Sequence, residues 1–324
     1  MSFYDKLVDI AGEDFVKENE ILSRHSTMKI GGAAKYFVNV KSFDELSKIV
    51  KLCNDEAVRF MLIGNGSNII FRDEGYDGVI ICTDSKESQI ASVEFYPGNE
   101  ITDKLSEKEY TDIEDSLFDY YCFAGAGIRL ANLVNQATAL SLSGLEFAGG
   151  IPGTVGGAVF MNAGAYGGEI KDSIIAAKVL TSDGEFKVIA AADLKLRYRG
   201  SAVQDEGYFV VEALFGMNKG NKEEITARIK ELNQKRRDKQ PLEYPSCGST
   251  FKRPVNGYAA QMIEECGLKG ERVGDMMISE KHAGFMINVG NGTCEDALKL
   301  VKIVQDKVQA EKGVLLEMEP LIVG

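Results

Sequence analysis

The stretch GLEFAGGIPGTVGGAVFMNAGAYGG, residues 144–168, decides how the rest of this chain is interpreted. Nine of its 25 residues are glycine, and the others include Pro152, Asn162 and ordinary hydrophobic residues, so it differs from a flexible Gly/Ser linker. Glycine is used where the backbone takes a positive φ or approaches another group closely. Two interpretations are open: backbone N–H groups turned toward an anionic ligand, or a tight series of turns between packed elements.

Two further Gly-rich turns lie beside predicted strands. The strand VRFMLI (58–63) runs into the loop Gly64-Asn65-Gly66-Ser67-Asn68, and FAGAG (123–127) precedes a helix-like segment, IRLANLVNQATAL. A strand that ends in a Gly/Asn/Ser loop is a common arrangement for holding a phosphate group. Together the three turns suggest one extended diphosphate-bearing ligand, such as a dinucleotide, held mainly by backbone groups.

Composition excludes several classes of protein. The chain has 324 residues, with 37 basic and 49 acidic side chains and a net charge of −12. This length predicts two or three packed units, and the acidic balance argues against a nucleic-acid binder. No apolar stretch approaches the ~20 residues that span a bilayer, and the acidic first residues differ from a signal peptide. We therefore expect a cytoplasmic protein without membrane insertion.

Cysteine and histidine usage excludes further classes. The six cysteines form no CxxC pair and the chain has two histidines, so we expect reduced thiols and no metal site. The motifs GxSxG, HExxH, GxxxxGK[ST] and GxGxxG are absent from the sequence. A lipase-type hydrolase, a zinc protease, a P-loop enzyme and a Rossmann dehydrogenase therefore have no local support.

The pattern of helices and strands indicates an α+β protein. A helix is predicted from the Ser42–Glu45 cap, with Leu46, Ile49, Val50 and Cys53 on one face. Two strands are predicted within 176–189 around a Ser182–Gly184 turn, and another within 207–217. Helices follow over about 221–241 and from the Thr293–Asp296 cap to about Gly313. We place a domain boundary near Gly220.

The segment from Thr83 to Asp119 has a different character from its surroundings. It holds eleven acidic residues against three lysines. We interpret it as a solvated surface hairpin or partly mobile loop that lengthens a surface connection, with no part in the chemistry.

The collected segments resemble one family, the UDP-N-acetylenolpyruvoylglucosamine reductases in their compact form, flavoenzymes that make UDP-N-acetylmuramate for bacterial peptidoglycan. STMKIGGAA (26–34), LIGNGSNII (62–70) and residues 144–170 are similar to its flavin-binding segments. LRYRGS (196–201), YPSCGSTFKRP (244–254), SEKHAGFMIN (279–288) and the C-terminal LLEMEPLIVG are similar to its substrate-site segments.

The resemblance implies a fold and a domain organisation. The fold is α+β: a two-subdomain FAD-binding fold of the p-cresol methylhydroxylase/vanillyl-alcohol oxidase type, plus a smaller α/β substrate-binding domain. The implied parts are FAD-binding subdomain 1 (1–82), FAD-binding subdomain 2 (83–219, with the acidic segment 83–119), a substrate-binding domain (220–312) and a C-terminal segment (313–324).

The resemblance also assigns roles to residues. The catalytic arginine falls on Arg199, the proton-donating serine on Ser249 and the catalytic glutamate on Glu319. Glu317 is a rival for Glu319 because both lie in LEMEP, where Pro320 stands in place of the family's usual Val. Substrate binding falls on Tyr198, Lys252 and Arg253, the last in a KRP that some members have as KNP. Cofactor binding falls on Gly64, Asn65, Gly66, Ser67, Asn68, Gly125, Gly127, Gly149, Gly150, Ile151, Pro152, Gly153, Thr154, Gly156, Gly157, Asn162, Ala163 and Gly164.

The implied reaction suits these residue types. NADPH, through noncovalently bound FAD, reduces the enolpyruvyl group of UDP-N-acetylglucosamine-enolpyruvate, and no oligomer is required. Arg199 offers a cationic fork to the carboxylate-centred charge, Ser249 a positioned O–H, and Glu319 a hydrogen bond to the carboxylate if it is protonated. Two alternatives remain: an FAD-dependent alcohol oxidase or dehydrogenase of the same fold, and a non-catalytic flavin carrier. Neither explains the CGSTFKRP and LEMEP segments.

Overall fold

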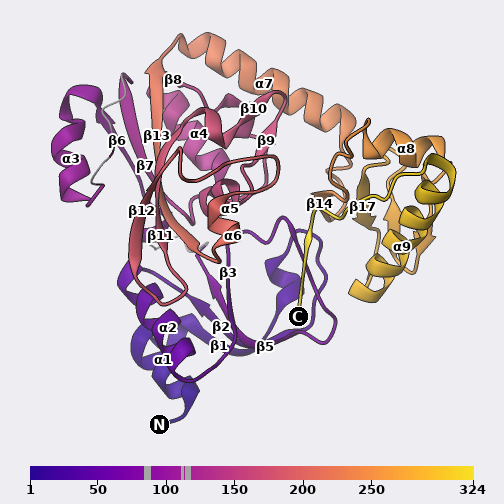
Figure 1. The fold of residues 1–324 in the computed structure, drawn as a ribbon, viewed down its shortest axis with the longest axis horizontal. Helices are drawn as coiled ribbons and strands as arrows, with labels where there is room; N and C mark the ends of the chain where they lie inside the picture. The colour runs from indigo at the N-terminus through magenta and orange to yellow at the C-terminus, as the bar shows by residue number, and fades with distance from the viewer. Residues whose placement is uncertain (84–88, 111–112, 114–117) are drawn as a thin grey trace. The chain divides into compact units, whose positions relative to one another are not determined.

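The computed structural model describes residues 1–83, 89–110, 113 and 118–324, shown in Figure 1. Its α-helices are α1 (Phe3–Ala11), α2 (Phe43–Asp55), α3 (Ile101–Glu107), α4 (Leu130–Ala139), α5 (Val155–Phe160), α6 (Ala202–Asp205), α7 (Lys222–Lys239), α8 (Ala259–Glu265) and α9 (Cys294–Lys312). Among the described residues, none of these helices has both the length and the apolar character needed to cross a lipid bilayer.

The strands form several sheets. A four-stranded sheet has the order β1-β2-β5-β3, made of β1 (Val16–Ile21), β2 (Ala33–Asn39), β5 (Tyr76–Cys82) and β3 (Phe60–Ile63). A six-stranded sheet has the order β12-β11-β13-β7-β6, with β8 (Leu142–Ser143) also on β13. Its other strands are β12 (Phe186–Ala190), β11 (Ile174–Leu180), β13 (Phe209–Lys219), β7 (Tyr120–Gly125) and β6 (Val93–Pro97).

Smaller sheets complete the fold. The order β14-β17-β16-β15 joins β14 (Ser246–Ser249), β17 (Phe285–Asn288), β16 (Met276–Ile278) and β15 (Arg272–Val273). Strand β18 (Leu321–Val323) pairs in parallel with β4 (Ile69–Phe71), and β9 (Gly164–Ala165) pairs with β10 (Gly168–Glu169).

The chain divides into two compact units, each assembled from separate segments. The first unit comprises Met1–Lys17, Phe37–Gly64 and Val79–Gln234. The second unit comprises Glu18–Tyr36, Asn65–Gly78 and Lys235–Gly324. The boundaries predicted at residues 82, 219 and 312 remain predictions.

In the first unit, local sequence signals place the elements. The Ser42 hydroxyl accepts a hydrogen bond from the N–H of Glu45 at 3.2 Å and begins α2, whose predicted inward face is buried. Strands β11 and β12 form the predicted hairpin, with Leu180 opposite Phe186 and Gly184 at a φ of 86° in the turn. The strand predicted within 207–217 is β13, which lies at the centre of the six-stranded sheet.

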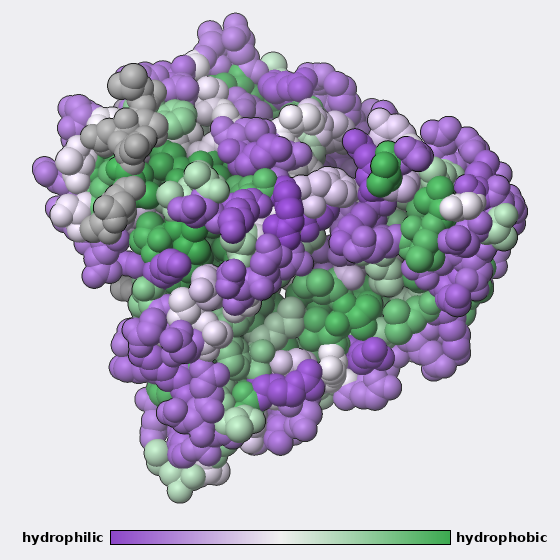
Figure 2. Space-filling view, viewed as in Figure 1, coloured by the Kyte–Doolittle hydropathy of each residue, from purple (hydrophilic) through white to green (hydrophobic). Residues whose placement is uncertain are grey.

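The second unit is built on α9 and the sheet β14-β17-β16-β15. Thr293 forms a capping box with Asp296 at the start of α9, and Gly313, at a φ of 70°, ends it. The inward face of α9 buries Leu300, Val301 and other apolar residues. Figure 1 shows the helix beside the small sheet. The outward face of α9 is polar. Figure 2 shows hydrophilic residues together with apolar patches over this region.

The prediction for the acidic segment 83–119 was wrong for most of its described residues. It is no hairpin: β6 pairs antiparallel with β7 at the edge of the six-stranded sheet, and α3 follows it. Ile101, Leu105 and Tyr110 are each at most 6% exposed and pack against that sheet. The apolar residues that pack against the sheet are separated by many acidic residues in the sequence. The high negative charge of the segment therefore led to the incorrect prediction of a surface loop. Residues 84–88, 111–112 and 114–117 of this segment lie outside the described residues.

A buried polar cluster also joins this segment to the sheet. Glu212 of β13 is 4% exposed, and its carboxylate accepts a hydrogen bond of 3.1 Å from the Tyr110 hydroxyl. The Lys108 ammonium lies 3.6 Å from the same carboxylate and 3.2 Å from that of Glu94. Burial raises the pKa of Glu212, and the nearby Lys108 opposes that rise. The cluster therefore fixes the segment to the central strand of the sheet.

If the segment is part of the core, shortening its buried side chains must destabilise the protein. Leu105→Ala is expected to lower the free energy of unfolding by about 2–5 kcal/mol, because it removes a buried side chain and leaves a cavity. Thr102→Ala, on the exposed side of the same helix, should change it by less than about 0.5 kcal/mol. Urea unfolding followed by circular dichroism measures both. Equal stability of the two variants would return the segment to the surface-loop interpretation.

Candidate active site

In the first unit, the structure joins two of the three predicted Gly-rich turns by backbone hydrogen bonds. The N–H of Leu130 donates to the carbonyl of Gly153 at 3.0 Å, and the N–H of Gly156 donates to the carbonyl of Ala126 at 2.9 Å. These bonds join the turn after β7 to the long Gly-rich segment. The third turn begins at Gly64, where a Cβ atom would lie 2.1 Å from the Thr154 hydroxyl. Gly64, the turn after β7 and the long Gly-rich segment therefore lie together in the first unit, whereas residues 65–68 of the third turn belong to the second unit.

The glycines of this region have two different physical roles. A Cβ atom on Gly125 would lie 2.2 Å from the carbonyl oxygen of Ile90, and one on Gly127 would lie 1.9 Å from that of Thr83. These two glycines allow the chain to pack on itself. A Cβ atom on Gly157 would lie 3.8 Å from the Thr154 hydroxyl oxygen, an ordinary contact distance, so this position leaves space. Backbone turns that converge around an open glycine fit a dinucleotide-type cofactor such as FAD.

The other predicted cofactor residues lie in turns. In the second unit, Gly66 has a φ of 59°, and its carbonyl accepts a hydrogen bond from the N–H of Thr27 at 3.2 Å. The remaining members of this group lie in the loop after β3 (Asn65, Ser67), before α5 (Gly149, Gly150, Ile151, Pro152), between α5 and β9 (Ala163) and at the start of β9 (Gly164). Their contacts with a cofactor remain predictions.

Arg199 lies in a tight turn of the first unit. The backbones of Arg197 and Gly200 exchange hydrogen bonds of 3.0 and 3.2 Å, which leaves Tyr198 and Arg199 at the tip. Arg199 has a φ of 54°, a left-handed conformation that is uncommon for a large side chain. Its guanidinium carbon lies 5.1 Å from the centre of the half-exposed Tyr198 ring. The turn therefore presents a cation and an aromatic ring together.

Asn162 holds this turn in place. Its side chain is 1% exposed, and its amide nitrogen donates to Glu169 Oε2 at 2.9 Å and to the Arg197 carbonyl at 3.2 Å. Its amide oxygen accepts from the N–H of Lys171 at 3.0 Å. A residue predicted to bind the cofactor thus uses its side chain to fix the backbone next to Arg199.

In the second unit, the segment that follows Ser249 pairs with the segment that carries Glu319. The N–H of Glu319 donates to the Thr250 carbonyl at 3.0 Å, and the N–H of Lys252 donates to the Glu317 carbonyl at 2.8 Å. Phe251 and Met318 form the antiparallel bridge between these bonds. The backbone of Glu319 is therefore hydrogen-bonded to the residue that follows Ser249, so two of the three predicted catalytic residues lie on paired segments.

The two rival glutamates have different surroundings. The Glu317 carboxylate is 72% exposed and forms an ion pair with Lys252. Glu319 is half-buried, and its Oε2 atom is buried. The amide of Asn68 donates to the Glu319 carbonyl at 3.3 Å, and the Asn68 carbonyl accepts from Leu321 at 2.9 Å. This geometry favours Glu319 as the catalytic carboxylate and assigns Glu317 to a surface ion pair.

Ser249 stands at the end of a strand with an irregular register. Ser246 lies opposite Ile287 and Ser249 opposite Phe285, so β14 holds one extra residue there, and Gly248 takes a φ of 80°. Burial raises the pKa of the Cys247 thiol to about 12, so this neighbour stays a neutral thiol.

The predicted substrate residues Lys252 and Arg253 follow on the same segment. Lys252 forms the ion pair with Glu317 described above. The guanidinium carbon of Arg253 lies 4.7 Å from the centre of the Tyr258 ring, which is 57% exposed. A cation held over an exposed aromatic ring can receive a phosphate or a planar base. Tyr258 did not emerge from the sequence because single tyrosines in loops carry no pattern.

His282 forms a hydrogen bond within its own turn. Its Nδ1 atom accepts a hydrogen bond from the N–H of Gly284 at 3.1 Å, and burial lowers its pKa. Gly284 in turn accepts from the N–H of Thr250 at 2.8 Å. Sequence reasoning missed Thr250, which links these segments. The sequence showed only that Thr250 is a polar residue between Ser249 and the apolar Phe251, which does not indicate burial.

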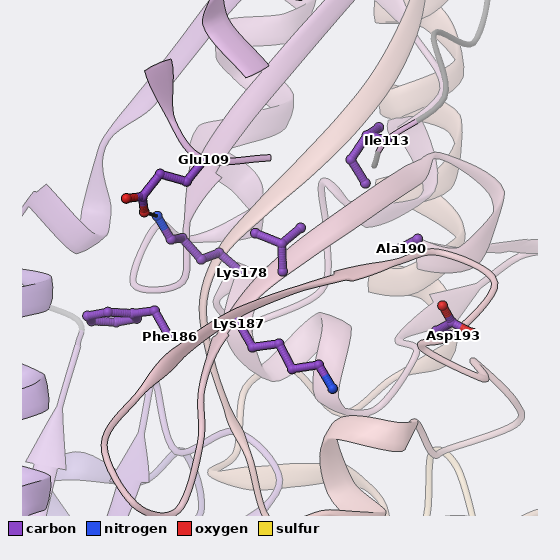
Figure 3. A pocket seen from close by; sticks show the side chains of 8 residues that line it. Glu109, Ile113, Lys178, Phe186, Lys187, Ala190 and Asp193 are labelled. Carbon is purple, nitrogen blue, oxygen red and sulfur yellow. Dashed lines mark hydrogen bonds and ion pairs between the residues drawn. The ribbon is translucent and has the colours of Figure 1, made fainter. Parts of the chain in front are cut away.

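A pocket of about 500 Å³ in the first unit is distinct from the predicted sites (Figure 3). It lies over β11 and β12, and it is lined by Glu109, Ile113, Lys178, Phe186, Lys187, Val188, Ala190 and Asp193. Lys178 and Glu109 form an ion pair of 2.9 Å within it. None of the Gly-rich turns and none of the predicted catalytic residues contribute to its lining.

Comparison with known proteins agrees with this geometry. Residues 240–323 match the family model of the UDP-N-acetylenolpyruvoylglucosamine reductase C-terminal domain, and residues 105–190 match that of the FAD binding domain. The UDP-N-acetylenolpyruvoylglucosamine reductase of Lachnoclostridium phytofermentans is 43% identical over 98% of this chain and 96% of its own length. That of Streptococcus pneumoniae is 43% identical over 100% of this chain and 99% of its own length.

A solved structure gives the same result. The UDP-N-acetylenolpyruvylglucosamine reductase of Thermus caldophilus superposes with a TM-score of 0.76 at 32% identity, over 96% of this chain and 100% of that one. The likeness covers nearly the whole chain, and the reductase family model over residues 240–323 includes Ser249 and Glu319. The chain therefore belongs to the UDP-N-acetylenolpyruvoylglucosamine reductase family, with the FAD-binding α+β fold predicted from its glycine pattern and sequence resemblance.

Proposed function

We propose that this chain reduces the enolpyruvyl group of UDP-N-acetylglucosamine-enolpyruvate to the lactyl group of UDP-N-acetylmuramate, with NADPH as electron donor. The observation that carries the proposal is the pairing of the Ser249 segment with the Glu319 segment. The reductase match over residues 240–323 argues against an alcohol oxidase, which has no reason to carry those segments. We place the reaction in the cytoplasm, and it requires no second copy of the chain.

The reaction adds a hydride to one carbon of the enolpyruvyl double bond and a proton to its neighbour. FAD, held by the converged Gly-rich turns, supplies hydride transfer when bound, because no side chain can do so. Arg199 stabilises the negative charge that develops on the substrate carboxylate, since its guanidinium is a fixed donor fork. Its left-handed turn, fixed by Asn162, holds that fork in place.

Ser249 donates the proton in this proposal. A serine hydroxyl is a weak acid, but the carbon it protonates is strongly basic, so position matters more than acidity. A neutral donor also avoids forming an ion pair with the substrate carboxylate. In its protonated form, Glu319 donates a hydrogen bond to that carboxylate and so orients it, and its Oε2 atom is buried. Lys252, Arg253 and Tyr198 supply cationic and aromatic contacts for the rest of the sugar nucleotide.

Flavin is expected to bind without a covalent link. His25 is the side chain to watch, because covalent attachment in this superfamily commonly uses His or Cys. Its Nε2 atom lies 2.9 Å from the Glu20 carboxylate, so it is engaged within the second unit. Acid precipitation should therefore leave the yellow colour in the supernatant. Colour that stays with the polypeptide, and is lost in His25→Ala, would contradict noncovalent binding.

Ser249→Ala is expected to impair only the second half-reaction. NADPH should bleach the flavin at nearly the normal rate, because this step precedes protonation of the substrate. Reoxidation by the enolpyruvyl sugar nucleotide should slow by about 10²–10⁴-fold, the loss typical of a missing general acid. Stopped-flow absorbance resolves the two steps, and Ser249→Cys should keep partial activity because a thiol also donates a proton.

Two results would contradict these assignments. Wild-type reoxidation in Ser249→Ala would make Ser249 a structural residue and leave proton donation to water or another side chain. A wild-type protein that the sugar nucleotide never reoxidises would contradict the proposed function itself.

The two glutamates provide a matched pair of variants. Glu319→Ala should slow reoxidation by about tenfold or more, because it removes the hydrogen-bond donor to the substrate carboxylate. Glu317→Ala should leave both half-reactions within about twofold, because it removes only an exposed ion pair. The same stopped-flow measurement compares them. A larger effect at Glu317 would exchange the two assignments.

A further inference from the structure

Thr250 is a buried polar residue that connects three segments of the second unit. It is 1% exposed. Its N–H donates to the Gly284 carbonyl at 2.8 Å, and its carbonyl accepts from the N–H of Glu319 at 3.0 Å. Its hydroxyl accepts from the N–H of Met286 at 2.7 Å. The backbone N–H, the backbone carbonyl and the side chain are each hydrogen-bonded to a different residue.

These bonds restrain the residue completely. The two backbone bonds fix the peptide planes on both sides of its Cα atom, and the hydroxyl bond selects one side-chain rotamer. The bonds lie away from water, where they are electrostatically stronger than at the surface. Rotation of Thr250 would break at least one buried bond, so the residue is held rigidly against β17.

Thr250 also lies directly between the two proposed catalytic residues of this unit. Ser249 is joined to it by a peptide bond, and Glu319 is joined to it by one hydrogen bond. The shortest path from the Ser249 backbone to the Glu319 backbone therefore passes through this residue. Any change in its orientation moves the Ser249 hydroxyl relative to the Glu319 carboxylate.

We propose that Thr250 is a positioning residue that sets the separation of the Ser249 hydroxyl and the Glu319 carboxylate through its hydroxyl bond to Met286. The proposal rests on the function proposed above and deepens it. Thr250 touches neither the reacting atoms nor the flavin in this role. Its effect is confined to substrate protonation, where a displacement of about 1 Å costs about 10²-fold in rate.

A purely structural role is the competing explanation, and the chain offers a matched control for it. Thr293 uses its hydroxyl in the same way, as acceptor for the N–H of Asp296 at 3.0 Å, at the start of α9 in the same unit. Thr293→Val removes a hydroxyl acceptor for a backbone N–H, as Thr250→Val does. It should lower the unfolding temperature and leave both half-reactions unchanged.

The test measures the half-reactions of the FAD-loaded full chain by stopped-flow absorbance. In Thr250→Val, flavin reduction by NADPH should stay within about twofold of wild type, while reoxidation by saturating sugar nucleotide slows about 10–100-fold. KM for the sugar nucleotide should change by less than about threefold, because binding is not impaired. Thr250→Ser keeps the hydroxyl and should restore reoxidation to within about threefold of wild type.

A second measurement is independent of activity. Hydrogen–deuterium exchange at the Met286 amide should be faster in Thr250→Val than in wild type, and unchanged in Thr293→Val. If Thr250→Val does not fold, Thr250→Ala removes the same bond without a β-branched side chain and takes its place in every comparison.

Several results would overturn the inference. Normal reoxidation in Thr250→Val with faster exchange at Met286 would show that the bond exists but does not position Ser249. Equal slowing in Thr250→Val and Thr293→Val would show an effect of stability. If Ser249→Ala reoxidises normally as well, the proposed function of Ser249 fails together with this inference, whereas normal reoxidation in Thr250→Val alone removes only the inference.

Discussion

The backbone hydrogen bonds between residues 250–252 and 317–319 are the constraint on which the site of the second unit depends. They join two segments that are far apart in the sequence. The C-terminal segment reaches this place because α9 ends at Gly313, Leu316 is buried in the core, and β18 pairs with β4. A glutamate near the end of the chain thereby acquires a fixed position next to Ser249. The burial of α9 therefore helps to fix the segment that carries the proposed catalytic Glu319.

Backbone hydrogen bonds between distant segments also shape the first unit. The turn after β7 and the long Gly-rich segment are joined by backbone hydrogen bonds. Gly125 and Gly127 allow neighbouring backbone segments to approach closely. A flavin is thus expected to bind to a surface that is already assembled, in which Gly157 leaves space. Asn162 contributes to the same rigidity through the turn that holds Arg199. Preorganisation by buried polar side chains is common to both units.

The sequence predicted much of this and missed the rest for identifiable reasons. Capping residues and apolar periodicity located α2, α9 and the β11–β12 hairpin, because these signals are local. Resemblance of the CGSTFKRP and LEMEP segments located Ser249 and Glu319. The packed segment around α3 was missed because its few apolar residues are dispersed among acids. Thr250 was missed because its role comes from hydrogen bonds to residues distant in sequence, which no local pattern reveals.

The most direct test of the central claim is a crystal structure of the Ser249→Ala variant with FAD and the enolpyruvyl sugar nucleotide bound. The variant allows the substrate to accumulate, because the expected loss is in protonation. The account predicts the enolpyruvyl carbon within hydrogen-bond reach of the position of the missing hydroxyl, and the substrate carboxylate on Glu319. An enolpyruvyl group bound away from residues 249–252 and 317–319 would contradict it.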